Sequence, residues 1–279
     1  MTGLGAGTRV SFAADSDRAT AIDAAARAFL RDGVVVLDDL VDPALLARCH
    51  AQLERDHADY VVVDLQRNFG NYKGRHTAPV LVDGAFAERA VFLPDPVIAL
   101  ARRLLGGAPE IDSFGVLVSL PGSNDQARHA DALLYPDVGA DVLVPPFAAA
   151  FAMPLVPMDA RSGTTGFWLG SHRKPGGKGP HDFAPEVMPG SALLWDFRLV
   201  HHGLANRGTA PRPVLFTVFC RPWWHQVVDP CATRYEKLVI SPRAFDALGA
   251  EGRRLAARAV VRGAPVDNPP SLEQPKELA

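Results

Sequence analysis

Three segments in the N-terminal part of the chain carry apolar side chains at helical spacing. The first has its capping residues at Asp15-Ser-Asp17 and ends at Gly33, a residue that favours the left-handed backbone of a helix C-terminus. The second begins at Asp42-Pro43, and the third runs from Asp95-Pro96 to Gly106-Gly107, with proline in the first turn of each. Because the apolar residues recur every three or four positions, we expect three helices that bury one face.

The pattern changes at about residue 110 to short apolar runs separated by turn residues. A last helix is expected from Ser241-Pro242 to about residue 262, and residues 173–182 are expected to form a flexible excursion. Short strands with turns between them are typical of a closed or sandwiched antiparallel architecture. The predicted strands lie at 34–37, 61–63, 114–120, near 129–131, and at 147–156, 167–169, 191–196 and 213–220.

Both ends of the chain lack these patterns. Residues 1–15 are predicted to be a flexible tail and the proline-rich residues 264–279 a disordered one, which leaves a single domain at 16–263. Hydrophobic residues make up 48% of the chain and charged residues 22%, as in soluble globular proteins. A formal net charge of −2 argues against a nucleic-acid-binding surface or a basic membrane patch.

The cysteines and the N-terminal residues indicate in which cellular compartment the protein is expected. Three cysteines, at positions 49, 220 and 231, fit neither a metal-finger spacing nor a disulfide framework, so free thiols in a reducing cytoplasm are expected. The N-terminus has no basic start followed by an apolar run, which argues against a signal peptide. No apolar run approaches the length of a membrane span. We therefore expect a cytoplasmic protein without nucleic-acid or membrane partners.

The candidate chemistry centres on His129-Ala-Asp131. Side chains repeat with period two along an extended strand, so this imidazole and this carboxylate point to the same side. Such a tripeptide alone is weakly specific, because a histidine beside an acidic residue is common. His201, at the end of a later apolar run, supplies a second imidazole. Together the three form the 2-His-1-carboxylate set that holds iron(II) and leaves coordination positions open.

An arginine follows His201 at a suggestive distance. Arg212 opens the next apolar run 11 positions later (212 − 201), after a turn rich in Gly and Asn. A connection of that length returns the chain beside its start, so we expect Arg212 to point into the same cavity as His201. The planar guanidinium can hold a carboxylate through two charge-assisted hydrogen bonds.

These features, taken in order, resemble the phytanoyl-CoA dioxygenase family of iron(II)- and 2-oxoglutarate-dependent oxygenases. The matching features are the helix-Gly-strand at 29–37, the His129-Ala-Asp131 motif, the segment 163–172 that ends in Gly-Ser-His, and the His201 to Arg212 spacing. They cover roughly residues 20 to 225. The resemblance implies a mainly β fold with flanking helices, a double-stranded β-helix (jelly roll, cupin-like).

The resemblance also implies the activity. Iron(II), 2-oxoglutarate and dioxygen would be required, with ascorbate as a reductant in vitro. His129, Asp131 and His201 would be the metal-binding catalytic residues, and Arg212 would hold the far carboxylate of 2-oxoglutarate. The expected reaction is hydroxylation of a small molecule, with a secondary metabolite as one candidate, and release of succinate and carbon dioxide. Desaturation, epoxidation and cyclisation use the same ligands and stay open, whereas the carboxylate of Asp131 argues against halogenation.

Further contacts are predicted from the same resemblance. In similar proteins a region equivalent to the polar segment 64–76 covers the active-site mouth, although its composition equally fits a solvated loop. Trp224 equally fits core packing. His202 should face away from the site, and His172 should have a structural role. The predicted contacts are Lys73 and Phe151 for the co-substrate, and Asn68, Tyr72, Arg75, Tyr135 and Trp224 for the substrate.

Two functions from other classes compete with an oxygenase. One is a non-catalytic small-molecule-binding protein on the same fold, which the complete set of His129, Asp131, His201 and Arg212 disfavours. The other is a zinc hydrolase, because two histidines and a carboxylate also suit zinc. Arg212 at this spacing disfavours that function, since hydrolysis has no use for a bound diacid.

Overall fold

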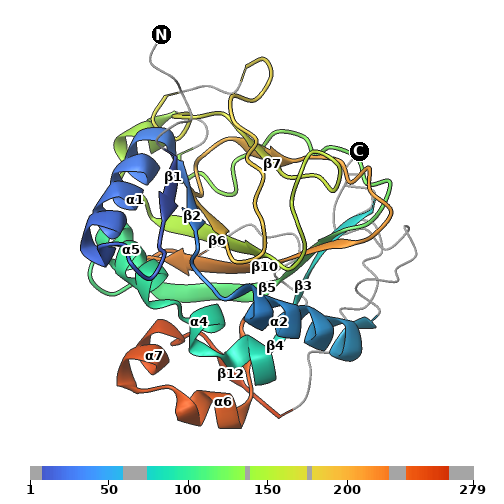
Figure 1. The fold of residues 1–279 in the computed structure, drawn as a ribbon. Helices are drawn as coiled ribbons and strands as arrows, with labels where there is room; N and C mark the ends of the chain where they lie inside the picture. Colours follow the sequence, from blue (N-terminus) through green and yellow to red (C-terminus); the bar gives the residue numbers. More distant parts are fainter. Residues whose placement is uncertain (1–7, 59–73, 136–138, 175–177, 226–236, 264–279) are drawn as a thin grey trace, which may run out of the picture.

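A computed structural model of the chain describes residues 8–58, 74–135, 139–174, 178–225 and 237–263. Its main feature is a seven-stranded sheet (Figure 1). Every neighbouring pair in this sheet is antiparallel except β1 and β2, which are parallel. The strand order is β1 (Arg9–Ser11), β2 (Val34–Asp38), β8 (Ala192–Asp196), β6 (Ala148–Pro154), β10 (Arg212–Cys220), β5 (Glu110–Ser119) and β3 (Arg75–Pro79).

The two faces of this sheet bury different partners, as the period-two alternation of a strand requires. On β2, Val35 and Leu37 belong to the larger core beneath the helices, whereas Val34 and Val36 belong to a second core on the other face. That second core contains Phe167 of β7 (Thr165–Phe167), which pairs antiparallel with β9 (His201–Gly203). A small two-stranded sheet therefore covers the face opposite the helices, and the candidate site lies on that side.

The structure confirms the three helices predicted in the N-terminal part of the chain. They are α1 (Arg18–Asp32), α2 (Pro43–Asp56) and α5 (Asp95–Leu105). The side chain of Asp17 caps α1 by accepting from the amide of Ala19, and Gly33 ends it with φ 87°. Asp42 caps α2 in the same way by accepting from Ala44. Helices α1 and α5 lie side by side on the outer face of the sheet (Figure 1). The short helices η1 (Gly84–Ala87) and α4 (Arg89–Phe92) were not predicted.

The C-terminal helix prediction was wrong. Instead of one helix to about residue 262, the chain forms α6 (Pro242–Ala247) and α7 (Ala250–Leu255), because Leu248 and Gly249 between them adopt extended backbone conformations. Strand β12 (Val260–Val261) follows and pairs parallel with β11 (Val239–Ile240), which pairs parallel with β4 (Leu81–Val82). This three-stranded sheet lies at the lower end of the molecule in Figure 1.

Other boundaries differ from the expectations. Residues 9–11, expected in a flexible tail, form β1 and are held to β2 by the ion pair of Arg9 with Asp38. Strand β5 begins four residues earlier than predicted, at Glu110, and the loop before β6 contains η2 (Ala140–Leu143). The predicted strand at 61–63 and the predicted tail at 264–279 lie outside the described residues. In the described part of the chain, every helix is too short or too polar to cross a bilayer.

Candidate metal centre and anion site

His129, Asp131 and His201 converge, with one ligand atom of each within 4.8 Å of the others. The Oδ1 atom of Asp131 lies 3.5 Å from Nε2 of His201 and 3.9 Å from Nε2 of His129. Donor atoms bound at right angles about 2.1 Å from one cation stand about 3 Å apart, so a small inward movement would complete the set. The donor set therefore fits iron(II).

The predicted strand at 129–131 was wrong, although the side chains of His129 and Asp131 do face the same point, as expected. His129 makes an isolated antiparallel bridge to His201, and Asp131 lies in a bend. The amide of His129 donates to the carbonyl of His201 at 3.0 Å, and the reverse bond is 2.8 Å long. Asp131 is held separately, because its amide donates to the carbonyl of Phe197 at 2.8 Å. Backbone pairing with the 197–201 segment thus places the ligands.

Both imidazoles are oriented in the same way. Nδ1 of His129 lies 2.9 Å from the carbonyl oxygen of Ala127, and Nδ1 of His201 lies 2.8 Å from that of Leu199. A carbonyl oxygen can only accept, so Nδ1 carries the proton in both rings and the lone pair of Nε2 points toward Asp131. This is the tautomer that a metal ligand needs.

The surroundings of His201 keep its ring neutral. The side chain is buried against Phe167 and Trp195, whose ring centroids lie 6.0 Å and 5.5 Å away. Burial lowers the pKa of His201, and the nearby carboxylate of Asp131 opposes this shift only in part. A neutral imidazole is the form that binds metal, so His201 is ready to act as a ligand at neutral pH.

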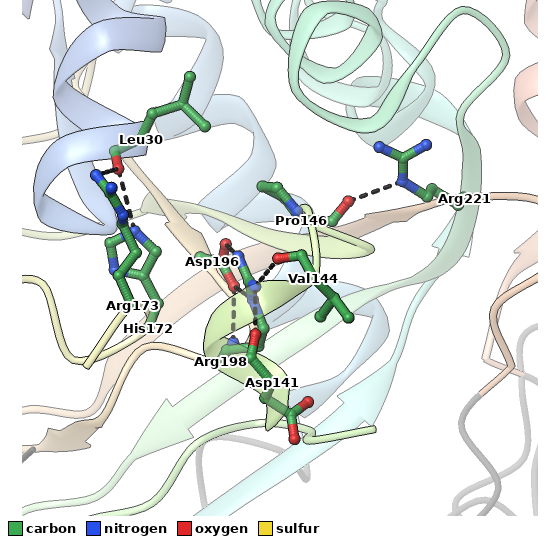
Figure 2. A network of polar contacts seen from close by, with 9 residues as sticks. All are labelled: Leu30, Asp141, Val144, Pro146, His172, Arg173, Asp196, Arg198 and Arg221. Carbon is green, nitrogen blue, oxygen red and sulfur yellow. Dashed lines mark hydrogen bonds and ion pairs between the residues drawn. The ribbon is translucent and has the colours of Figure 1, made fainter. Parts of the chain in front are cut away.

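A buried ion pair supports the segment that follows Asp131. The guanidinium of Arg198 bonds both carboxylate oxygens of Asp196, at 2.8 and 2.6 Å, and Figure 2 shows it between Asp196, Asp141 and Val144. Its Nη1 donates to the carbonyl oxygens of Asp141, at 2.8 Å, and of Val144. The carboxylate of Asp141 in turn accepts from the amides of Leu134 and Tyr135, at 2.5 and 2.7 Å. Strand β8 therefore anchors the segment next to the candidate ligand Asp131.

Arg212 forms the second half of the site. Ser119 on the central strand β5 is the register partner of Arg212 on β10 and of Arg75 on β3, so all three side chains share one face. Arg212 is 3% exposed, its Nη2 donates to Oγ of Ser119 at 2.8 Å, and its buried Nε has no partner. Among the described residues no carboxylate pairs with it. A buried cation of this kind is suited to an anionic ligand.

The charge of Arg212 responds to its surroundings. Burial, and then the positive charge of Arg75, lower the pKa of the Arg212 guanidinium to about 9. It still carries its charge at neutral pH, where a bound carboxylate would offset both unfavourable effects. Two guanidinium groups facing the same interior space create a strongly positive environment there.

Arg75 connects this anion site to the metal-binding residues. It was predicted to lie in a polar loop but opens β3, and it is buried. Its Nη2 donates to the carbonyl oxygens of Leu204, at 2.8 Å, and of Asn124, at 3.3 Å. A Cβ atom on Gly203, two residues after His201, would lie 2.3 Å from Nη1 of Arg75. The guanidinium of Arg75 therefore packs closely against the backbone of Gly203 at the end of β9.

The structure contradicts one predicted contact. Phe151 on β6 is fully buried in the core beneath the helices, on the face opposite Trp195, so its assignment to the co-substrate was wrong. Trp224 is buried against Phe147 and Phe197, which fits the core packing that the sequence left open, and its contact with substrate stays a prediction. Tyr135 is half exposed four residues after Asp131. Lys73, Asn68 and Tyr72 lie outside the described residues.

His202 and His172 lie outside the candidate ligand set, as expected. His202 points away from the metal ligands, packs on Trp168 at a centroid distance of 5.0 Å and has its Nε2 3.1 Å from Nδ1 of His181. His172 is buried against Gly33 and has its Nε2 3.3 Å from the carbonyl of Leu30, which ties the segment after β7 to helix α1 (Figure 2). Trp195 and Ser119 were not predicted as site residues, because tryptophan and serine carry no metal- or anion-binding pattern of their own in the sequence.

The model of the phytanoyl-CoA dioxygenase (PhyH) family matches residues 29–214 of this chain. This match spans more than half of the 279 residues, so the chain belongs to the phytanoyl-CoA dioxygenase family. It is an oxygenase of the non-haem iron- and 2-oxoglutarate-dependent class, as the sequence predicted.

Solved structures share the fold. The α-ketoglutarate-dependent epimerase SnoN from nogalamycin biosynthesis matches with TM-score 0.57 and 20% identity, over 73% of this chain and 84% of that one. The carbocyclase SnoK from the same biosynthesis matches with TM-score 0.52 and 17% identity, over 70% and 82%. HygX from Streptomyces hygroscopicus, solved with nickel, 2-oxoglutarate and hygromycin B, matches with TM-score 0.52 and 15% identity, over 70% and 86%. At these identities the likeness confirms the mainly β, double-stranded β-helix fold alone.

Proposed function

We propose that this oxygenase hydroxylates a small molecule, with His129, Asp131 and His201 as its iron(II) ligands and Arg212 as the anchor of 2-oxoglutarate. The observation that carries the proposal is the pairing of two features. The three candidate ligands converge, and the buried guanidinium of Arg212 has no carboxylate partner among the described residues. Its neighbour Arg75 donates to the carbonyl of Leu204, directly after the strand of His201. A keto diacid could bind a metal through its keto-acid end and a buried cation through its far carboxylate, so this combination of groups suits 2-oxoglutarate.

Each residue has a separate task. Iron(II) would be held by Nε2 of His129 and His201 and by Oδ1 of Asp131, a set of three ligands that leaves coordination positions for other molecules. Iron(II), when bound there with 2-oxoglutarate and dioxygen, supplies the oxidation of an unactivated carbon–hydrogen bond. Arg212 and Arg75 orient the diacid through its far carboxylate, while the apolar surroundings of His201 exclude water on the buried side.

The substrate itself is proposed to be a small molecule that enters from the exposed side of His129. The side chain of His129 is 33% exposed and that of Asp131 is 24% exposed, whereas His201 is only 6% exposed. Tyr135 lies close along the chain to these ligands, and it stays a candidate substrate contact. Asn68, Tyr72 and Lys73 also stay predictions, as does action in the cytoplasm.

An anaerobic titration tests the assignment of the residues. Adding iron(II) and 2-oxoglutarate to the wild-type protein should produce a visible metal-to-ligand charge-transfer band. Asp131→Ala should abolish the band, whereas Arg212→Met should keep metal binding and weaken the apparent affinity for 2-oxoglutarate at least about tenfold. Arg207→Met, which removes an exposed arginine from the same turn, is the matched control and should behave like wild type. Wild-type 2-oxoglutarate affinity in Arg212→Met would contradict the role of Arg212.

Turnover tests the reaction type. Candidate small molecules are incubated with the enzyme, iron(II), 2-oxoglutarate, ascorbate and air, and both succinate and product mass are measured. Hydroxylation adds one oxygen atom, cyclisation or desaturation removes two hydrogen atoms, and epimerisation leaves the mass unchanged. Epoxidation of an alkene also adds one oxygen atom, so substrate-dependent succinate with a gain of one oxygen on a saturated substrate is the result that supports hydroxylation. A loss of two hydrogen atoms would support cyclisation or desaturation instead, and an unchanged mass would support epimerisation. A product formed without succinate would contradict an oxygenase of this type.

A further inference from the structure

The two carboxylate oxygens of Asp131 have different neighbours. Oδ1 is the atom that faces the imidazoles of His129 and His201, at 3.9 and 3.5 Å. Oδ2 accepts a hydrogen bond from the indole Nε1 of Trp195 at 3.0 Å. The indole nitrogen is a donor only, so it can hold a carboxylate oxygen but cannot compete for the metal. Trp195 thus binds Oδ2, the carboxylate oxygen that does not face the two imidazoles.

The indole is fixed in place from several sides. Trp195 lies on β8, where its register partners are Val34 on β2 and Ala150 on β6. Its ring packs against Phe167 at 5.9 Å and against His201 at 5.5 Å between centroids. Rotating the N–H away from Asp131 would require this aromatic cluster to repack, so the donor is held in position before any metal arrives.

The backbone attaches the carboxylate to the same segment. The amide of Asp131 donates to the carbonyl of Phe197, two residues after Trp195, and the amide of Ala132 donates to the same oxygen at 3.2 Å. The donor and the carboxylate that it bonds are therefore carried by two stretches of chain hydrogen-bonded to one another. Their relative position does not depend on long flexible connections.

We propose that Trp195 is a positioning residue of the metal centre, which holds Oδ2 of Asp131 so that the carboxylate binds the ion through Oδ1 alone. A carboxylate that turned to bind through both oxygens would occupy a coordination position that 2-oxoglutarate or dioxygen requires. Partners of this kind, which bond a ligand rather than the metal, typically change metal affinity by about 10- to 100-fold. The inference rests on the proposed ligand set and adds a residue to which no metal role has been assigned.

Cobalt(II) titration of the metal-free protein is the direct test, with calorimetry for affinity and visible absorption for coordination. Trp195→Phe removes the N–H and keeps an aromatic ring, and we expect it to weaken cobalt(II) binding about tenfold or more and to change the absorption spectrum. The matched control is Trp168→Phe, because the Trp168 indole donates to the carbonyl of Gly179 at 3.2 Å instead of to a metal ligand. This control should keep wild-type affinity and spectrum.

A second replacement separates the hydrogen bond from packing. Benzothienylalanine at position 195 keeps the size and shape of the indole but has sulfur in place of the N–H, so its fold should match wild type by circular dichroism. We expect the same loss of cobalt(II) affinity as in Trp195→Phe. If this isosteric protein binds cobalt(II) like wild type, the positioning role is wrong while the ligand set stands. If wild type itself fails to bind cobalt(II), both the inference and the proposed function fall.

Discussion

His129 and His201 are direct backbone partners, joined by two hydrogen bonds of 3.0 and 2.8 Å, although 72 positions (201 − 129) separate them in the chain. Their rings consequently lie close together and tilted to one another, at a centroid distance of 4.5 Å and an interplanar angle of 51°. Because main-chain hydrogen bonds hold this pair, folding alone brings the two imidazoles together, without a bound cation. A metal that arrives has only side-chain adjustments to make.

Metal binding should therefore raise the stability of a protein that is already folded. Manganese(II) or cobalt(II) at about 100 times its dissociation constant should add about 2.7 kcal/mol to the unfolding free energy of wild type. Asp131→Asn should unfold at nearly the wild-type temperature without metal and should lose this increase, because its side chain is partly exposed and its backbone bonds remain. Differential scanning calorimetry with and without metal measures both. An equal metal-dependent increase in the variant would show that Asp131 is not a ligand.

Arg212→Met should separate stability from co-substrate binding. The buried guanidinium has no carboxylate partner among the described residues, so replacing it with an apolar side chain of similar length removes a desolvated charge. We expect the unfolding free energy of the ligand-free protein to stay level or to rise by about 1–4 kcal/mol. The extra stability that 2-oxoglutarate adds to the metal-bound wild type should vanish. Urea unfolding measures both, and a large loss of stability would mean that Arg212 is a structural residue.

Breaking the Asp196–Arg198 pair should have the opposite effect on stability. Both side chains are buried, and Arg198→Met leaves the Asp196 carboxylate uncompensated, so we expect a loss of about 3–5 kcal/mol in urea unfolding. The double variant Arg198→Met/Asp196→Leu should recover part of that loss, because it removes both charges. Arg173→Met, which changes an exposed arginine in the same region (Figure 2), should cost little. Equal losses in the single and double variants would refute the uncompensated charge as the cause.

His172 should make the fold sensitive to mild acid. Burial lowers the pKa of His172 below its usual value of about 6.5, so below that pH the unfolded chain binds a proton that the native ring resists. The unfolding free energy should fall as pH drops below about 6.5, by at most about 1.4 kcal/mol per pH unit for this group. His172→Gln keeps a donor near Leu30 and removes the titrating ring, which should flatten the slope. Parallel stability curves for the two proteins from pH 7 to 5 would contradict this assignment.

Much of the fold followed from local patterns in the sequence. The caps at Asp17, Asp42 and Gly33 mark helix ends because they satisfy backbone groups within a few residues. The prediction of one C-terminal helix failed at Leu248 and Gly249, where the backbone is extended although the helical spacing of apolar residues continues. The periodicity of apolar residues indicates which side chains are buried, but it does not indicate where the chain changes direction.

The sequence by itself determined the candidate donor set. His129, Asp131 and His201 are recognisable because metal-ligand chemistry is restricted to few residue types, and Arg212 is recognisable by its spacing of 11 positions (212 − 201) from His201. Only the tertiary structure decided the partners of these groups. The alternation of side chains along a strand predicts that neighbouring residues face opposite sides of a sheet, but it does not say what each side contacts. Strand pairing decided that Trp195 faces Asp131 and that Phe151 faces the helices. Likewise, register across β3, β5 and β10 placed Arg75 beside Arg212. Contacts between distant strands depend on register, and register is a property of the assembled sheet.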